Sequence, residues 1–166
     1  SGTPSPNIQW YRNNTAVGTN NPTNFSYSTS LAGNYYCIVS NTCGSVQSNV
    51  ATLSINTVPV ITYISPSTTI CIGQGITFNV TASGTSPFTY QWYKGSNAIT
   101  GATGSSYSIN SALAGDAGTY YCKVYNSCSS TGVQSNGIDL TILSLPIIST
   151  QPSNQSVCEG QSANFS

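Results

Sequence analysis

Residues 116–122 read Asp-Ala-Gly-Thr-Tyr-Tyr-Cys, and residues 91–93 read Gln-Trp-Tyr. Both stretches have a second copy nearer the start of the chain, with Gln-Trp-Tyr at 9–11 and Tyr-Tyr-Cys at 35–37. The two tryptophans are 82 positions apart and the two cysteines are 85 positions apart. A period of this size is that of one small β-sandwich domain, so the chain is predicted to be a tandem repeat.

A third copy begins near the end of the chain. Residues 158–161, Cys-Glu-Gly-Gln, match residues 71–74, Cys-Ile-Gly-Gln, which lie 87 positions earlier. This alignment places Ser166 opposite Asn79. We therefore expect the C-terminal part of one domain, one complete domain and the first strands of a third, with a natural terminus at neither end. The expected boundaries are 1–57, 58–145 and 146–166, and the two junctions are followed by Pro59 and Pro146.

Short runs of alternating apolar and polar residues fill the chain, separated by Gly, Ser, Asn and Pro. Residues 76–80, Ile-Thr-Phe-Asn-Val, have the period of two that is typical of a half-buried strand. No window keeps the period of a helix, so the fold is predicted to be all-β. In the complete domain we expect strands at 76–80, 90–93, 107–109, 120–124 and 138–142.

Charge is almost absent. The chain has three basic and three acidic residues and no histidine, and charged side chains make up 4% of it. Nucleic-acid binding needs a basic face, and a membrane helix needs about 18 consecutive apolar residues, so we expect neither activity. Without histidine, a paired carboxylate or a phosphate-binding loop, we expect no enzyme and no cofactor. Metal-binding spacings such as Cys-x-x-Cys and Asp-x-Asp are absent too.

The repeated motifs resemble those of immunoglobulin-like domains, which are Greek-key β-sandwiches. Gln-Trp-Tyr resembles the third strand of that family with its buried tryptophan, and residues 116–122 resemble its corner and sixth strand. The resemblance implies that Trp10 and Trp92 are core residues rather than exposed sugar-stacking platforms. It also implies that Tyr35 and Tyr120 hydrogen-bond back across the corner that precedes their strand.

Two positions depart from the family pattern. Val80 stands where the second strand of the family carries the partner of Cys122, so the usual disulfide between the sheets cannot form. Cys37 and Cys122 are then expected to be buried as small apolar groups. The first copy has Leu31 where the second has Asp116, so a corner carboxylate is missing from it.

The other four cysteines are expected at the rims of the sandwiches. Cys71 and Cys158 precede the second strand of their copies and are placed at the lower rim, whereas Cys43 and Cys128 follow the sixth strand and are placed at the upper rim. Cysteines at fixed repeat positions in a chain without histidine favour an oxidising, extracellular compartment and disulfides.

Three pairings of these cysteines stay open. A thiol of the Cys71 type can meet the Cys128-type thiol of the following domain, which would lock each joint between domains. A bridge within one hairpin, Cys122 to Cys128 or Cys37 to Cys43, is the second arrangement. Reduced thiols, or bridges between filaments, are the third.

Exposed tyrosines are the candidates for ligand contacts, with cross-strand packing as the alternative explanation. They are Tyr11, Tyr93, Tyr107 and Tyr125.

The set Val/Ile-Cys-x-Gly-Gln, Gln-Trp-Tyr, Tyr-Tyr-Cys, Asn-x-Cys and Gln-Ser-Asn is similar to the repeats of very large surface adhesins of gliding and biofilm-forming Bacteroidetes. This resemblance implies a structural and adhesive repeat of a long secreted or surface-anchored fibre. Its partners would be neighbouring repeats and a surface polysaccharide or protein. The alternatives are a carbohydrate-binding module array attached to a secreted enzyme and a subunit of a self-assembling extracellular filament.

Overall fold

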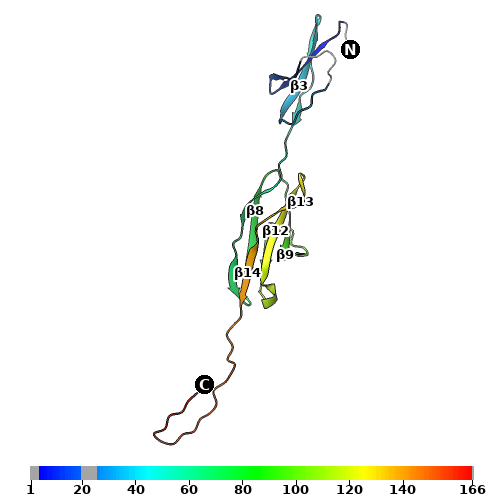
Figure 1. Ribbon diagram of the computed structural model, residues 1–166. Helices are drawn as coiled ribbons and strands as arrows, with labels where there is room; N and C mark the ends of the chain where they lie inside the picture. The colour runs from blue at the N-terminus through cyan, green and yellow to red at the C-terminus, as the bar shows by residue number, and fades with distance from the viewer. Residues whose placement is uncertain (1–3, 20–25, 166) are drawn as a thin grey trace. The chain divides into compact units, whose positions relative to one another are not determined.

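The computed structural model describes residues 4–19 and 26–165. The chain divides into two compact units, Ser1–Thr57 and Val58–Ser166, and Figure 1 shows the strands of each. Apart from one short 3-10 turn, Ala114–Asp116, the regular structure in the described residues consists of strands. The prediction of an all-β fold is confirmed.

The first unit contains one sheet among its described residues. Its central strand β3 pairs with β1, β4 and β5, and β1 also pairs with β2. All of these pairs are antiparallel. The strands are β1 (Asn7–Arg12), β2 (Thr15–Val17), β3 (Gly33–Asn41), β4 (Gly44–Gln47) and β5 (Ala51–Leu53).

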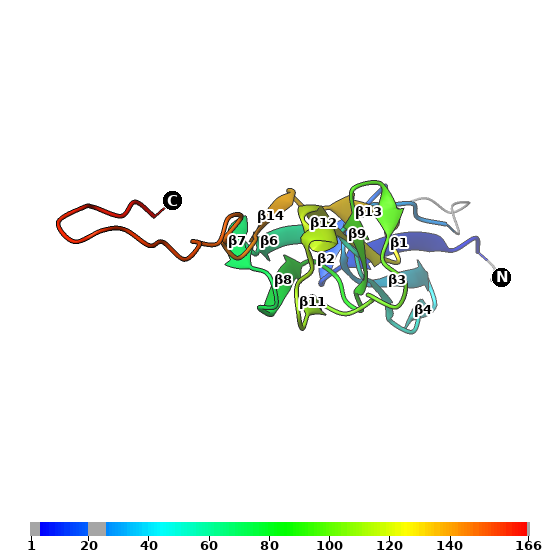
Figure 2. The ribbon, with the colours of Figure 1, turned by 90° about the horizontal axis from the view of Figure 1, so that it is seen from below.

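The second unit is a sandwich of two sheets. One sheet has the order β10-β9-β12-β14-β7 with β13 also on β12, and the other has the order β11-β8-β6. Figure 2 looks along the strands, with β8 and β11 on one side and β9, β12 and β13 on the other. The strands are β6 (Val60–Ile64), β7 (Thr68–Cys71), β8 (Ile76–Ser83), β9 (Thr89–Lys94), β10 (Asn97–Ala98), β11 (Ser106–Ile109), β12 (Gly118–Asn126), β13 (Ser129–Gln134) and β14 (Ile138–Leu143).

The first two strands of this unit belong to different sheets. β6 pairs antiparallel with β8 in one sheet, and β7 then pairs parallel with β14 in the other. Between residues 144 and 165 the structure has no strand, so the first strands expected for a third domain at 146–166 are not formed there. Within the described residues the counterpart of β6 has no neighbouring strand with which to form hydrogen bonds.

Aromatic side chains fill the space between the two sheets. Trp92 is fully buried, and its indole Nε1 donates to the carbonyl of Gly104 at 3.0 Å. The ring of Phe78 lies 6.3 Å from that of Trp92 and 5.1 Å from that of Tyr120. Val80 from β8 belongs to the same buried cluster. The alternation of strand residues places these side chains inside.

In the first unit the corresponding core is open. Tyr35 is 6% exposed, but Trp10 and Cys37 are only half-buried. The buried Nε1 of Trp10 has no hydrogen-bond partner within the described residues. The difference follows from the sheets, because the described part of this unit contains no strands like β6, β7 and β8 to cover the inner face of β1 and β3.

Candidate functional site

One exposed cysteine lies at the C-terminal end of the complete domain. Cys71 is the last residue of β7 and is paired with Leu143, the last residue of β14. The amide of Ile72 donates to the carbonyl of Leu143 at 2.9 Å. The side chain of Gln74 accepts a hydrogen bond from the amide of Cys71 at 3.1 Å, and Gly73 takes a φ of 85°. The motif Cys-x-Gly-Gln is therefore a tight turn that holds the thiol beside the point where the chain leaves the domain.

The same turn forms in the third copy. The amide of Gln161 donates to the carbonyl of Cys158 at 3.0 Å, as the amide of Gln74 does to the carbonyl of Cys71 at 3.2 Å, and Gly160 takes a φ of 84°. Cys158 is exposed. The turn therefore depends on its own four residues and not on the sheet beside it.

A second exposed cysteine lies at the opposite end of the domain, in the turn between β12 and β13. The amide of Cys128 donates to the side-chain oxygen of Asn126 at 3.0 Å, and the amide group of that side chain donates to the carbonyl of Thr85 at 2.8 Å. Next to Thr85, a Cβ on Gly84 would lie 2.6 Å from the carbonyl oxygen of Val58, so this loop touches the first residue of the domain. The motif Asn-x-Cys thus places a thiol where the chain enters the domain.

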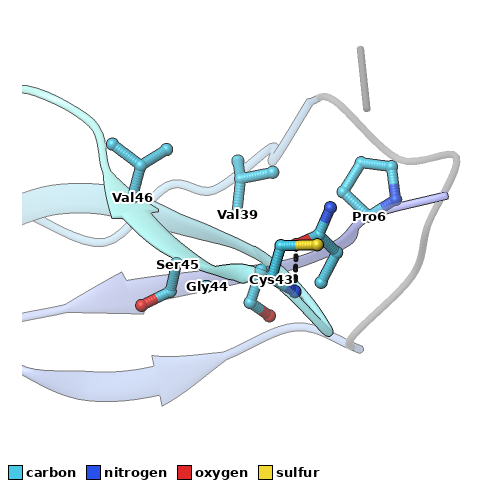
Figure 3. Close-up of a pocket in the computed structure, with 8 residues that line it drawn as sticks. Pro6, Val39, Cys43, Gly44, Ser45 and Val46 are labelled. Carbon is cyan, nitrogen blue, oxygen red and sulfur yellow. Dashed lines mark hydrogen bonds between the residues drawn. The ribbon is translucent and has the colours of Figure 1, made fainter. Parts of the chain in front are cut away.

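The first unit repeats this turn. The amide of Cys43 donates to the side-chain oxygen of Asn41 at 2.9 Å. Figure 3 shows Cys43 with Pro6, Val39 and Val46 around an open hollow of about 330 Å³. Cys43 is exposed, like Cys128.

The two ends of one domain are far apart, as Figure 1 shows for the end of β14 and the β12–β13 turn. Leu143 lies three residues beyond Leu140, which pairs with Gly118, and Asn126 lies eight residues further along β12. At about 3.3 Å per residue the separation is roughly 35 Å, whereas disulfide-bonded cysteines have Cα atoms no more than about 7 Å apart. Cys71 and Cys128 of one domain therefore cannot bond to each other.

The hairpin bridge is also disfavoured by the geometry. Asn126 pairs with Ser129 at the tip of the hairpin, and Cys122 lies four residues before Asn126. That length of strand spans roughly 13 Å, again beyond the reach of a disulfide. Cys122 points into the core with no exposed surface, while Cys128 is exposed.

Cys37 and Cys122 have a structural role. Burial raises the pKa of the Cys122 thiol to about 11, so the unreactive thiol form persists at neutral pH. The amide of Cys122 donates to the hydroxyl of Ser135 at 3.0 Å, and the amide of Cys37 donates to the hydroxyl of Ser48 at 3.0 Å. These serines are the centre of the motif Gln-Ser-Asn, which explains why the motif recurs.

The corner hydrogen bond implied by the family resemblance is present in both units. The hydroxyl of Tyr120 donates to the carbonyl of Asp116 at 2.7 Å, and that of Tyr35 donates to the carbonyl of Leu31. Because the acceptor is a backbone carbonyl, the change from aspartate to leucine leaves the bond intact. The Asp116 carboxylate instead accepts a hydrogen bond from the amide of Leu113 at 2.8 Å.

Sequence reasoning missed a second link to the same corner. Lys94 Nζ donates to the carbonyl of Gly115 and lies 5.7 Å from the ring centre of Tyr120. In the first unit Arg12 Nε donates to the carbonyl of Ala32 at 3.0 Å. The sequence contains a signal for this link, because one basic residue directly follows Gln-Trp-Tyr in each copy. It is Arg12 in the first copy and Lys94 in the second.

The candidate tyrosines mainly pack against other aromatic rings. Tyr93 stacks on Tyr121 at 4.8 Å between ring centres with planes 6° apart, and Tyr11 stacks on its neighbour Tyr36 at 5.1 Å with the same angle. The hydrogen bond between the hydroxyls of Tyr125 and Tyr93 raises the pKa of Tyr125 to about 12. The candidates Tyr11, Tyr93 and Tyr125 lie on the outer face of the sheets, since their neighbours along each strand point into the core.

Tyr107 is half-buried and packs against the core instead, with its ring 6.0 Å from that of Tyr120 and 6.3 Å from that of Trp92. Over residues 4–19 and 26–165, no cluster of three or more potential metal ligands exists. In the same residues no helix is long and apolar enough to cross a membrane.

Two immunoglobulin-domain family models match the chain, one over residues 58–126 and the other over residues 1–55. Hemicentin-2 of Mus musculus is 30% identical over 133 residues, which cover 76% of this chain and 2% of hemicentin-2. Protein sidekick-2 of Gallus gallus is 27% identical over 191 residues, covering 99% of this chain and 8% of sidekick-2. The chain thus spans a small part of these curated relatives.

Solved structures show the same fold. An I-band fragment of titin superimposes with a TM-score of 0.69 at 19% identity, covering 92% of this chain and 60% of the fragment. Immunoglobulin domains 1–4 of sidekick-1 superimpose with a TM-score of 0.52 at 22% identity, covering 98% of this chain and 48% of that one. The chain is therefore an all-β protein of tandem immunoglobulin-like domains.

Proposed function

We propose that this chain is a structural and adhesive repeat of a long extracellular or cell-surface fibre. The observation that carries the proposal is the placement of two exposed cysteines, Cys71 where the domain ends and Cys128 where it begins. Both are held by turns that recur in other copies, at Cys158 and Cys43. A repeat with a reactive group at each end is suited to joining neighbours in a line.

The joint is a disulfide between a Cys71-type thiol and the Cys128-type thiol of the next domain. Two thiols lose two protons and two electrons when the bond forms, and a small-molecule disulfide such as oxidised glutathione takes them up and becomes two thiols. Such an oxidant belongs to the secretory or extracellular compartment. The exposure of Cys43, Cys71, Cys128 and Cys158 supports this chemistry, and the burial of Cys122 keeps it out of the exchange.

The proposed partners are neighbouring repeats and a surface polysaccharide or protein. The nearly uncharged surface supports contact with neutral or polar material rather than with polyanions. The fully buried Trp92 offers no platform for sugar stacking, so the fibre is favoured over a carbohydrate-binding module array. The similarity of the five repeated motifs supports a source among bacterial gliding or attachment adhesins, while the relatives named above are animal proteins.

Surface labelling tests this function. Fab fragments raised against residues 58–145 should label intact cells of the source organism and reduce their attachment to a surface. Fab fragments against an intracellular protein are the control. Labelling that requires permeabilised cells, or attachment that is unchanged when labelling is complete, would contradict the proposal.

A further inference from the structure

One asparagine of the complete domain is followed directly by glycine. Asn136 and Gly137 lie in the stretch 135–137 between β13 and β14, where the structure has no strand. Both residues are exposed. Because glycine has no Cβ, its backbone nitrogen is unshielded and a neighbouring group can approach it closely. The pair therefore combines an exposed amide side chain with an accessible backbone nitrogen next to it.

The first unit contains the same stretch with a different following residue. Asn49 occupies the position of Asn136 in the motif Gln-Ser-Asn, and Val50 stands where the complete domain has Gly137. Asn49 is exposed and Val50 is 56% exposed, in a stretch that likewise has no strand. A β-branched side chain places two heavy atoms on Cβ, close to its own backbone nitrogen. The two copies are thus a matched pair within one chain.

The backbone before both asparagines is held in the same way. The amide of Ser135 donates to the carbonyl of Cys122 at 2.9 Å, and the hydroxyl of Ser135 donates to the carbonyl of Asn136 at 2.8 Å. In the first unit, Ser48 makes the two corresponding hydrogen bonds, both at 2.9 Å. A difference in reactivity between the two asparagines therefore reports on the residue that follows each of them and not on the turn.

We propose that Asn136 is a site of spontaneous deamidation in the folded domain and that the product charges the sheet edge beside it. The backbone nitrogen of Gly137 attacks the side-chain carbonyl carbon of Asn136 and loses its proton, and ammonia leaves as a succinimide ring closes. Water then opens the ring at either carbonyl and leaves aspartate or isoaspartate. The overall reaction converts one amide and one water molecule to one carboxylate and one ammonium ion, so it needs no oxidant or other co-reactant.

The new carboxylate lies beside an edge strand without charge. Asn136 lines a groove of about 470 Å³ together with Val60, Thr62 and Tyr63 of β6. Within the described residues β6 pairs with β8 alone, and it contains no charged residue. Residues 58–145 carry two basic and two acidic side chains, so the reaction takes the domain from a net charge of zero to minus one. Charged groups at a sheet edge oppose pairing with another edge, so deamidation reduces lateral association.

Peptide mapping by mass spectrometry of the 166-residue chain, aged in native buffer at mildly alkaline pH, tests the chemistry. Conversion of amide to acid should be at least about tenfold faster at Asn136 than at Asn49. Val50→Gly should make Asn49 react as well, while Asn136→Gln should remove the reaction because its side chain is one carbon longer. Two results would overturn the inference: equal rates at the two asparagines of the unaltered chain, or an intact Asn136 after the time in which a synthetic peptide of residues 133–140 deamidates.

Light scattering of the concentrated chain, in reducing buffer so that no disulfide contributes, tests the effect on the edge. Asn136→Asp carries the charge of the product, and Asn136→Gln is the uncharged control. At low salt the Asp variant should scatter at least about twofold less than the Gln variant, and the difference should shrink as salt screens the charge. Equal or greater scattering from the Asp variant would overturn the link to β6. Neither measurement depends on a surface location or a joint disulfide, so this proposal and the proposed function fail separately.

Discussion

The hydroxyl of Tyr120 donates a 2.7 Å hydrogen bond to the backbone carbonyl of Asp116, four residues earlier and across the corner that leads into β12. Tyr35 makes the same bond to the carbonyl of Leu31 in the first unit. The bond fixes the start of β12. This strand carries the buried Cys122 and leads into the turn that holds Cys128. It therefore connects a core residue to the placement of one of the two joint cysteines.

Removal of this hydroxyl should destabilise the complete domain. Tyr120→Phe keeps the buried ring and leaves the carbonyl of Asp116 without its partner, which should cost about 1–2 kcal/mol of unfolding free energy. Urea denaturation followed by circular dichroism measures the change. Tyr121→Phe, on the outer face of the same strand, is the matched control and should have a smaller effect. Equal effects of the two variants would show that the corner bond contributes nothing specific.

Truncation of the central tryptophan should have a larger effect. Trp92 is fully buried against Phe78 and Tyr107, so Trp92→Ala should lower the unfolding free energy by about 3–5 kcal/mol. Trp10→Ala should cost less because Trp10 is half-buried. Thermal and urea unfolding of the whole chain compare the two variants. Near wild-type stability of Trp92→Ala would mean that this side chain is exposed in solution.

Alkaline pH should unfold the complete domain. Burial raises the pKa of Tyr120 to about 12, and the bond to Tyr93 raises that of Tyr125 to about 12, from 10.0 without these interactions. The folded state prefers the neutral phenol, so its contribution is fully present below pH 10 and is lost as the pH rises toward 12. Unfolding free energies at several pH values, with tyrosinate absorbance, test this. Stability that stays constant up to pH 12 would contradict it.

Lateral association should be little affected by salt. The edge strands β6, β7, β10 and β11 contain no charged residue, and exposed Val60 and Tyr63 lie on β6. Light scattering of a purified array across a salt series should show bundles whose amount changes little with salt concentration. Val60→Lys should reduce it more than Leu113→Lys does. Bundles that dissolve in moderate salt would show that charge, not the open edges, holds them.

The sequence was sufficient for the parts of the fold that depend on local pattern. The alternation at 76–80 and the Gln-Trp-Tyr and Tyr-Tyr-Cys motifs predict the strands β8, β9 and β12 because one face of each strand is buried. The roles of Ser135, Asn126 and Lys94 could not be predicted, since their partners are backbone groups brought close by the fold. The half-exposed state of Trp10 was missed for a related reason, because burial depends on strands from another part of the repeat.

The joint between repeats is tested most directly by mass spectrometry of the natural protein, taken from the cell surface, alkylated and digested without reduction. The account predicts a disulfide between a Cys71-type peptide and a Cys128-type peptide of the following repeat, with Cys122-type cysteines recovered as thiols. Cys122-type cysteines bonded to Cys128-type cysteines, or Cys71-type cysteines recovered as alkylated thiols, would contradict it.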